Sequence, residues 1–536
     1  MATVSEVIAG YLDAAGIRHV FGYPGDPSVE VIEAFRQAGI RFVLGRREGT
    51  AGLMALAYAQ VTGRPGVALS TLGPGSSNLT NAVATALLDR VPLIAISGQI
   101  ETRREAVFTH QVLDHARMFG PISKWTAELR ASAAGATLRR AFRTATAERP
   151  GPVHLTTPAD VVGAEAGDAA IALPPLRPAA TAVQVFADPG VVADPLKRLA
   201  AARRPVIVAG IGALRAGATA PLVRLAEAAG IPVVTSPMAK GLMPEDHPYF
   251  ASVLDMACND VVWDFLEGAD LIVCAGFDAV ELIKSWTPKA PVIHIDAIPN
   301  IDQVYPAEVE VVGDVAAILA SLADGWKGEP RWREAEVAGH RETLSTAYYE
   351  GRVAGALNPT DVIDQVRAAM PAESRATADV GSHKLLVGQG WRTSIPGGVL
   401  MTNGLSSMGY SLPGAITAAL VEPERPCVCF TGDGGLAMVQ SELALGAELK
   451  TAPLVVVFCD DSLNRIELKQ MRRQYPAEGT RMMPIDVARA AEAMNCHALT
   501  ADSTATLDKA LAERRPTDRP TVIAARIDPA QYAAQF

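Results

Sequence analysis

Residues 427–464 read CVCFTGDGGLAMVQSELALGAELKTAPLVVVFCDDSLN. Two apolar, β-prone runs, CVCF and LVVVFC, stand on either side of one helix-prone stretch. This order predicts two parallel strands joined by a helical crossover, because parallel strands need a connection of a dozen or more residues. Both runs end in acidic residues, Asp433 after the first and the pair Asp460 and Asp461 after the second. We therefore expect the strand ends to carry the chemistry of this segment.

The turn after the first run, from Gly432 to Gly435, has the composition of an anion site. Glycines let backbone N–H groups approach a phosphate, and the N-terminus of the following helix adds partial positive charge. Asp433 would repel a phosphate unless a cation lay between them, and Mg²⁺ is usually held by one or two carboxylates plus phosphate oxygens. Asp460 follows Asp433 by 27 residues, at the end of the next strand. Parallel strands end at one sheet edge, so the sequence predicts a metal–diphosphate site there, with a solvated tight turn as the alternative.

The rest of the chain repeats this order of strand and helix. Apolar runs such as GVALS and PLIAIS alternate with helix-prone segments. The pattern predicts an α/β protein with three doubly wound parallel-sheet domains, in agreement with 536 residues at roughly 150 residues per domain. The domains are expected at 1–165, 189–328 and 358–536, with linkers at 166–188 and 329–357.

The composition argues against several classes of protein. The net charge is −10, so we expect neither nucleic acid nor a membrane as a partner. The sequence shows no long apolar run and no charged leader with an apolar stretch, which favours a cytoplasmic protein. Its six cysteines are scattered without a CxxC pair, as expected in a reducing compartment.

The Gly-Asp-Gly turn and the later polar pair resemble the signature of thiamine diphosphate (ThDP) enzymes. In that family the pair is normally Asn-Asn. The first Asp, the second Asn and a backbone carbonyl two residues further bind the metal. The resemblance implies Asp433, Asp460 and the carbonyl of Ser462 as Mg²⁺ ligands. Cys459 stands where the family has its first Asn, so Asp461 remains the alternative ligand if the strand is displaced by one residue.

Residues 43–99 resemble the pyrimidine-binding domain of the acetolactate synthase group. The group's Arg-His-Glu motif is Arg46-Arg47-Glu48 here. The resemblance implies that Glu48 hydrogen-bonds the cofactor's pyrimidine ring and favours the tautomer in which the neighbouring amine acts as a base. A surface ion pair is the alternative role for this glutamate.

Two further segments resemble the family's cofactor cradle. ADVGSHKLLVGQGW implies Gly381, Ser382 and His383 beside the diphosphate, and TNGLSSMGYSLPG implies Met408 as the bulky residue between the cofactor's two rings. A Met is otherwise more often core filler. The complete set of expected cofactor-binding residues is Glu48, Pro24, Gly73, Gly381, Ser382, His383, Met408, Gly432, Asp433, Gly434, Gly435, Asp460 and Ser462.

The residues expected to act on the substrate come from two loops. FTHQVLDHARMFGPISKW resembles the FAD-independent, catabolic acetolactate synthases and offers His110 and Gln111 as active-site polar groups. GYPGDPS places Asp26 where synthases usually have a small residue and simple 2-oxo acid decarboxylases have Gly-Asp. Asp26 and His110 would suit the proton transfer that releases an aldehyde, and Asp26 as a plain turn residue is the alternative.

The middle domain resembles the central domain of the same group. The arginine-containing run associated with FAD in the FAD-dependent synthases is replaced by AGFDAVE at 275–281. Gly210-Ile211-Gly212 is too short a motif to predict a nucleotide site. We therefore expect a structural domain without FAD.

The resemblance covers nearly the whole chain in the family's domain order. It implies ThDP and Mg²⁺ as cofactors and decarboxylation of a 2-oxo acid, most simply pyruvate, with the thiazolium as electron sink. The remaining fragment is then joined to a second carbonyl, as in acetolactate synthases, or protonated and released as an aldehyde. A non-catalytic ThDP-fold binding protein is a third hypothesis, although it would not need Glu48. The family also implies a homodimer or homotetramer with active sites at the subunit interface. The C-terminal DPAQYAAQF fits either a cover over the site or an interface segment.

Overall fold

The strands of the computed structural model form three separate six-stranded sheets, and every pairing within them is parallel. The structure describes residues 2–168, 189–516 and 518–535. The predicted fold class, three doubly wound parallel sheets, is confirmed. The described residues divide into two compact units, one made of 2–168, 405–423 and 439–449, the other of 189–404, 424–438, 450–516 and 518–535.

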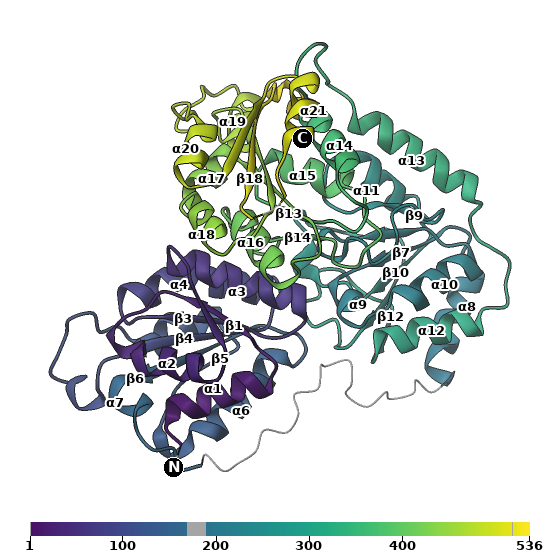
Figure 1. The fold of residues 1–536 in the computed structure, drawn as a ribbon. Helices are drawn as coiled ribbons and strands as arrows, with labels where there is room; N and C mark the ends of the chain where they lie inside the picture. Colours follow the sequence, from purple (N-terminus) through teal and green to yellow (C-terminus); the bar gives the residue numbers. More distant parts are fainter. Residues whose placement is uncertain (1, 169–188, 517, 536) are drawn as a thin grey trace. The chain divides into compact units, whose positions relative to one another are not determined.

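The first unit is built on the sheet β2-β1-β3-β4-β6-β5. Its strands are β1 (His19–Gly22), β2 (Arg41–Leu44), β3 (Gly66–Ser70), β4 (Leu93–Gln99), β5 (Trp125–Glu128) and β6 (Pro152–Pro158). Its helices are α1 (Val4–Ala14), α2 (Val29–Gln37), α3 (Glu48–Thr62), α4 (Pro74–Leu88), α5 (His115–Phe119), α6 (Ala134–Thr146), α7 (Ala159–Val162), α16 (Ser411–Val421) and α18 (Glu442–Glu448). Helices α3 and α4 cover one face of the sheet, and α1 and α6 cover the other (Figure 1).

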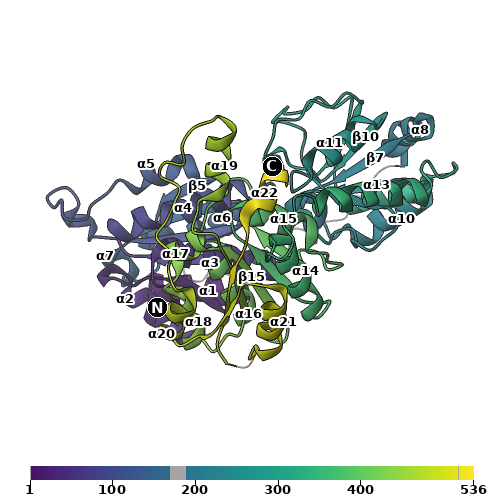
Figure 2. The ribbon, with the colours of Figure 1, turned by 90° about the horizontal axis from the view of Figure 1, so that it is seen from above.

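The second unit contains the middle sheet, ordered β12-β11-β10-β7-β8-β9. Its strands are β7 (Pro205–Ala209), β8 (Val233–Thr235), β9 (Phe250–Val253), β10 (Leu271–Ala275), β11 (Val292–Asp296) and β12 (Val309–Val312). The surrounding helices are α8 (Ala193–Ala201), α9 (Ile211–Arg215), α10 (Thr219–Ala229), α11 (Asn259–Glu267), α12 (Val315–Gly325) and α13 (Glu334–Tyr348). Figure 2 shows β7 and β10 between α11 and α10, so this sheet too is covered on both faces.

The second unit also contains the sheet predicted from residues 427–464, ordered β14-β13-β15-β16-β18-β17. Its strands are β13 (Arg375–Ala378), β14 (Val399–Met401), β15 (Cys427–Gly432), β16 (Leu454–Cys459), β17 (His497–Ala501) and β18 (Thr521–Arg526). The associated helices are α14 (Pro359–Ala369), α15 (Ser382–Gly390), α17 (Asp433–Val439), α19 (Asn464–Arg472), α20 (Val487–Ala493), α21 (Thr504–Glu513) and α22 (Tyr532–Gln535).

Strands β15 and β16 pair directly and in parallel, with Gly432 opposite Phe458. Both are buried almost throughout, which explains their continuous apolar composition. The connection differs from the single helix that the sequence suggests, because it is divided into α17 and α18. The second helix begins at Glu442, whose buried carboxylate has hydrogen-bond partners of its own in the first unit.

Two predicted linkers remain to be placed. Most of 166–188 lies outside the described residues. Residues 329–357 include α13, whose Val337 is buried in the middle core, so this stretch contributes to packing as well as to the connection. In the part of the chain that the structure describes, no helix is long and apolar enough to cross a bilayer.

Candidate functional site

Each of the three sheets has a central reversal, where its strand order runs outward in opposite directions. The reversal lies between β1 and β3 in the first sheet, between β7 and β10 in the middle sheet and between β13 and β15 in the third. In open α/β sheets, ligands bind outside the carboxyl ends of the strands at this reversal. The loops that follow these strands are therefore where the expected site residues have to be.

The third reversal gathers most of the predicted diphosphate cradle. Gly381, Ser382 and His383 follow β13, and the Gly432–Gly435 turn follows β15. The sequence alone does not predict that these two groups lie side by side, because the order of strands in a sheet cannot be read from their spacing. The topology now sets both groups beside one crevice position of the sheet.

Asp433 joins the ends of β15 and β16. Its Oδ1 accepts a hydrogen bond from the backbone N–H of Gly434 at 2.7 Å. Its Oδ2 accepts from the N–H groups of Asp460 at 3.1 Å and Asp461 at 2.7 Å. The structure thus brings Asp433 and Asp460 together at the sheet edge where their spacing predicts that they meet.

The electrostatics of this pair favour a cation. Burial raises the pKa of the Asp433 carboxyl. Burial, and after it the charge of Asp433, raises the pKa of Asp460 to about 7. Two close carboxylates that resist ionising together are stabilised by a divalent ion, which favours their charged forms.

The donor set fits Mg²⁺ bound together with a diphosphate. Among the described residues, no three His, Cys, Asp or Glu side chains are grouped so that they could hold a metal. The Asp433–Asp460 pair would therefore need a backbone carbonyl and phosphate oxygens to complete a shell. That mixed shell is the one that Mg²⁺ usually takes in proteins.

Asp461 occupies a turn. Its φ is +54°, and its carboxylate forms an ion pair with Arg526 at 3.6 Å. Its carbonyl accepts a hydrogen bond from Met482 N–H at 2.9 Å. The Asp461 carboxylate thus has a cationic partner in Arg526, although its charge also contributes to the raised pKa of Asp433.

Ser462 is buried and is held by a residue that the sequence reasoning missed. Its hydroxyl donates to Oε2 of Glu467, and the other oxygen of Glu467 pairs with Arg481. The backbone N–H of Ser462 lies 3.4 Å from Oδ1 of Asp460. Glu467 lies in the first turn of α19. An acidic residue at the start of this helix is the sequence feature that could have identified it.

His383 is a buried, neutral residue of the cradle. Burial lowers the pKa of its imidazole to about 3, and the ring stacks on Phe458 with centroids 5.2 Å apart. Its Nε2 has no hydrogen-bond partner among the described residues. A Cβ added at Gly381 would lie 2.5 Å from the His383 ring, so glycine is required for this close approach.

Two other contacts hold the cradle loops together. The Ser382 hydroxyl donates to Oδ1 of Asn464 at 2.9 Å, which joins the starts of α15 and α19. Asp379, also missed from the sequence, is fully buried and accepts a hydrogen bond from Thr431 at 3.2 Å. A Cβ at Gly435 would lie 2.5 Å from the Asp379 carboxylate, so the glycine lets α17 start against it.

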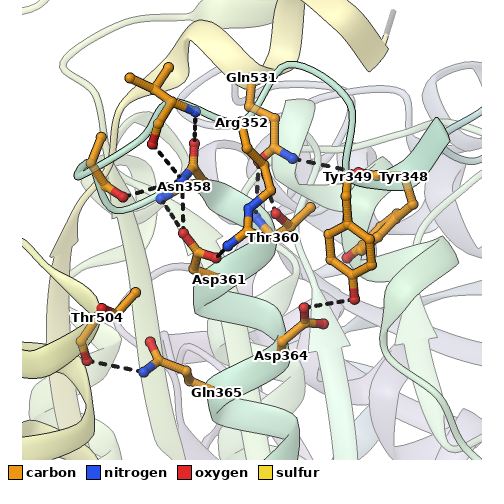
Figure 3. Close-up of polar contacts among 12 residues, drawn as sticks. Tyr348, Tyr349, Arg352, Asn358, Thr360, Asp361, Asp364, Gln365, Thr504 and Gln531 are labelled. Atoms are coloured by element: carbon orange, nitrogen blue, oxygen red, sulfur yellow. Dashed lines mark hydrogen bonds and ion pairs between the residues drawn. The ribbon is translucent and has the colours of Figure 1, made fainter. Parts of the chain in front are cut away.

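The C-terminal segment packs within the second unit. Burial, and then the charges of Asp460 and Asp433, raise the pKa of Tyr532, which is 2% exposed. The preceding residue, Gln531, is held by Thr360 (Figure 3). Its side-chain oxygen accepts hydrogen bonds from the backbone N–H and the hydroxyl of Thr360. The segment therefore contributes a buried ring near the carboxylate pair.

The first unit shows a second cluster of loops at its own reversal. A Cβ at Gly25 would lie 2.1 Å from the Thr71 hydroxyl, and one at Gly98 would lie 2.8 Å from Pro27. The loops after β1 and β3 and the end of β4 are thus in close contact. Pro24 and Asp26 lie on this rim and are exposed.

Glu48 is the first residue of α3 and is 8% exposed. Its Oε2 accepts a hydrogen bond from Asn78 at 3.2 Å, and a Cβ at Gly75 would lie 3.1 Å from its Oε1. The predicted glutamate and the predicted Gly-Pro-Gly turn are therefore neighbours. The buried position does not agree with the alternative of a surface ion pair.

Gln111 lies over the same turn. Gly73 has a φ of +48°, and a Cβ there would lie 2.6 Å from the Gln111 carbonyl oxygen. The His110 and Gln111 side chains are exposed. No hydrogen bond or ion pair between described residues joins His110 to Asp26, so the structure does not bring these two predicted partners together.

Met408 belongs to the first unit and is partly buried. Its neighbour Ser407 donates a hydrogen bond to Oδ1 of Asn81 on α4 at 2.7 Å. The segment expected to support the cofactor rings is thus attached to the helix that begins at the Gly-Pro-Gly turn.

The middle reversal is occupied by a side chain of the chain itself. Glu281 is fully buried and accepts hydrogen bonds from Ile211 N–H at 3.1 and 3.0 Å. A Cβ at Gly210 would lie 2.4 Å from its Oε2, and burial raises the pKa of Glu281 to about 8. Gly210 to Gly212 is too short a motif to predict a nucleotide site, and no sequence signal predicts this buried carboxyl.

Comparison with known families covers all three sheets. Residues 2–118 match the N-terminal TPP binding domain of thiamine pyrophosphate enzymes, residues 192–322 match their central domain, and residues 379–525 match their C-terminal TPP binding domain.

Similar proteins extend the match over nearly the whole chain. A catabolic acetolactate synthase of Raoultella terrigena is 29% identical over 98% of this chain and 95% of its own length. The large subunit of acetolactate synthase isozyme 1 of Escherichia coli K12 is 31% identical over 87% of this chain and 83% of its own. A protein named "probable 2-ketoarginine decarboxylase" from Pseudomonas aeruginosa is 32% identical over the same two shares.

Fold and site together define a class of protein with three parallel α/β sheets and a carboxylate pair suited to a metal-bound diphosphate. The three family matches, which follow one another along the chain, narrow this class to one family. The chain belongs to the thiamine pyrophosphate enzyme family and is a ThDP-dependent enzyme similar to acetolactate synthases.

Proposed function

We propose that the protein catalyses Mg²⁺- and ThDP-dependent decarboxylation of a 2-oxo acid, pyruvate, and joins the retained fragment to a second carbonyl. The observation that carries this proposal is the Asp433–Asp460 pair at the common end of β15 and β16. The pair calls for a divalent cation, and Mg²⁺ bound together with the diphosphate of ThDP would supply it. Similarity to several acetolactate synthases supports the carboligation step.

The proposed metal ligands are Asp433, Asp460 and the carbonyl of Ser462. The diphosphate would be held by backbone groups and side chains of the two loops at the third reversal, namely Gly381, Ser382, His383, Gly432, Gly434 and Gly435. When bound, ThDP supplies the nucleophilic carbon and the electron sink for loss of CO₂. Met408 would support the rings, and Pro24 and Gly73 would line them.

Glu48 would hold a hydrogen bond to the cofactor's pyrimidine nitrogen and so favour the tautomer that carries the base. Its burial supports this role, since the carboxyl is shielded from water and is oriented by Asn78. Removal of water strengthens such a hydrogen bond relative to one made in solvent.

An aldehyde-releasing 2-oxo acid decarboxylase is the second candidate function. Asp26 lies on the loop after β1, and His110 and Gln111 lie on the loop after β4, which contacts the turn at Gly73; the exposed Asp26 and His110 could deliver a proton to the reacting carbon. The relative named for 2-ketoarginine decarboxylation supports this possibility.

The two functions are separated by the product formed from pyruvate. Purified protein with Mg²⁺ and ThDP is expected to yield acetolactate, with acetaldehyde as a minor product. Acetaldehyde as the main product would favour the decarboxylase. In that case Asp26→Asn and His110→Ala should each reduce aldehyde release. Binding of ThDP without any CO₂ release from 2-oxo acids would support a non-catalytic protein instead.

We also propose a cytoplasmic homodimer or homotetramer with active sites at the subunit interface and a middle domain without FAD. Glu281 supports the absence of FAD, because its carboxyl already accepts the hydrogen bond of the Ile211 N–H at the middle reversal. Light scattering of the purified protein tests the assembly. A flavin absorption band in protein purified with FAD would contradict the absence of FAD.

A further inference from the structure

A buried carboxyl group from the C-terminal half of the sequence lies against the start of α3. Glu442 is the first residue of α18, and its side chain is fully buried. Its Oε1 accepts a hydrogen bond from Arg46 N–H at 2.9 Å and a second one from the Thr50 hydroxyl. These two contacts stand on either side of Glu48 in the sequence.

The contacts fix the backbone that presents Glu48. Arg46 lies two residues before it and Thr50 two residues after it, and the Thr50 hydroxyl also lies 2.8 Å from the carbonyl oxygen of Arg47. A buried backbone N–H needs a partner, and an acidic group near a helix N-terminus is electrostatically favourable. Glu442 therefore holds the turn from outside while Asn78 orients the Glu48 side chain directly.

Packing alone does not explain this residue. Burial raises the pKa of Glu442, and its Oε2 has no hydrogen-bond partner among the described residues. A buried carboxyl group with an unsatisfied oxygen costs stability relative to a well-packed apolar side chain. The contacts that it does make all go to residues 46–50.

We propose that Glu442 is a positioning residue that holds the 46–50 turn so that the Glu48 carboxyl is presented to the cofactor. This inference rests on the proposed function, because it gives Glu48 the activating role. Glu442 acts through the Arg46 backbone and the Thr50 hydroxyl, and it needs an acceptor at the Oε1 position.

The same helix supplies a matched control. Glu448, also on α18, pairs with the Arg46 side chain at 2.5 Å but is 60% exposed. Exposed pairs of this kind contribute little to stability. Glu448→Gln therefore disturbs the same arginine without touching the buried contacts.

The first readout is amide hydrogen exchange of residues 44–52, measured on the full chain without and with ThDP and Mg²⁺. Glu442→Ala removes the acceptor and is expected to speed exchange in this segment by about tenfold. Glu442→Gln keeps an acceptor and is expected to stay within about twofold of the unmodified protein. Glu448→Gln is expected to show no change.

The second readout is exchange of the thiazolium C2 proton for deuterium in bound ThDP, measured together with kcat and KM. Glu442→Ala should slow C2 exchange and kcat by about ten- to a hundredfold while KM for the 2-oxo acid changes little. Thr50→Val removes one of the two contacts and should give about a threefold loss. Glu442→Gln should restore both values to within about threefold, which a general loss of folding would not do.

Wild-type exchange rates in Glu442→Ala, at both the segment and the C2 proton, would overturn the proposal. So would a Glu442→Gln variant as impaired as the Ala variant. The proposed substrate fails separately if C2 exchange behaves as expected but no 2-oxo acid loses CO₂. If Glu48→Gln leaves C2 exchange unchanged, the role of Glu48 and this inference are both wrong.

Discussion

The carboxyl groups at the third reversal and the one at the start of α3 are held in opposite ways. Burial raises the pKa of both Asp433 and Asp460, and the charge of Asp433 adds to the shift of Asp460, whose pKa rises to about 7. Glu48 has an amide partner in Asn78, and its flanking residues are tied by Glu442. The first group is strained until a cation arrives, whereas the second is ordered before any ligand binds.

The difference indicates how each of these two regions would gain free energy on binding a ligand. A metal bound with a diphosphate would relieve repulsion at the Asp433–Asp460 pair, so binding there would offset a cost present in the folded chain. At Glu48 the ordering has already been achieved within the protein, so a ligand loses little freedom in forming its hydrogen bond. Substitutions in the two regions are therefore expected to change the stability of the cofactor-free protein in opposite directions.

The largest expected effect comes from Glu48→Gln. The amide cannot favour the reactive pyrimidine tautomer as a carboxyl does, so turnover should fall by about 10²- to 10⁴-fold. The affinity for ThDP should stay within about fivefold, because the diphosphate and metal contacts are intact. Steady-state kinetics and a binding titration measure the two quantities. Turnover at the wild-type rate would remove Glu48 from the mechanism.

Asp460→Asn should act in opposite directions on the free and loaded protein. At pH 8 the folded Asp460 is charged beside Asp433, and this destabilises the free protein because the folded pKa is about 7, above its unfolded value. Removing the charge should stabilise the cofactor-free protein by about 1 to 2 kcal/mol and reduce the added stability from Mg²⁺ and ThDP.

Thermal unfolding with and without cofactor measures both effects. Asp461→Asn is the matched control, because its carboxylate is paired with Arg526 and its charge raises the pKa of Asp460 less than that of Asp433 does. A cofactor-free Asp460→Asn protein less stable than the unmodified chain would refute the idea of a strained pair.

The first unit, which contains Glu48, should lose folding stability in acid. His115 anchors the loop that carries His110 and Gln111, since its ring contacts the hydroxyls of Ser76 at 3.0 Å and Thr156 at 3.2 Å. Burial lowers the pKa of His115 to about 4. The unfolded chain therefore binds a proton between about pH 6.5 and pH 4 that the folded chain excludes, and stability is lost as the pH falls through this window.

His115→Gln should remove about 2 kcal/mol of the stability lost between pH 7 and pH 5. Denaturant unfolding at the two pH values provides the measurement. An unchanged pH dependence would show that His115 is not kept neutral by the fold. His154 and His383 are also buried with lowered pKa values, so part of the acid sensitivity should remain.

The sequence was informative where chemistry and periodicity coincide. The order of strand, Gly-Asp-Gly turn, helix and strand predicted that Asp433 and Asp460 meet at one edge, because parallel strands fix that geometry. Glu48 and the Gly-Pro-Gly turn were found through motif resemblance, and the structure places them side by side.

Other parts of the site depend on contacts that spacing cannot reveal. Glu442 reaches Arg46 across 396 sequence positions, and a buried acid on a short helix looks like any surface glutamate in the sequence. Strand order, which sets the three reversals, depends on which strands pair. The register between Asp460 and Asp461 was likewise open, because a turn with positive φ at Asp461 leaves no unambiguous sequence signal.

The central claim is that Asp433 and Asp460 form the metal end of a ThDP site, and binding of ThDP as a function of Mg²⁺ concentration tests it most directly. The unmodified protein should bind ThDP in a Mg²⁺-dependent manner, and Asp460→Ala should weaken that binding by at least about tenfold. Asp461→Ala should bind within about threefold of the unmodified protein, because its carboxylate pairs with Arg526. Binding of ThDP that needs no divalent cation, or a loss confined to Asp461→Ala, would contradict the account.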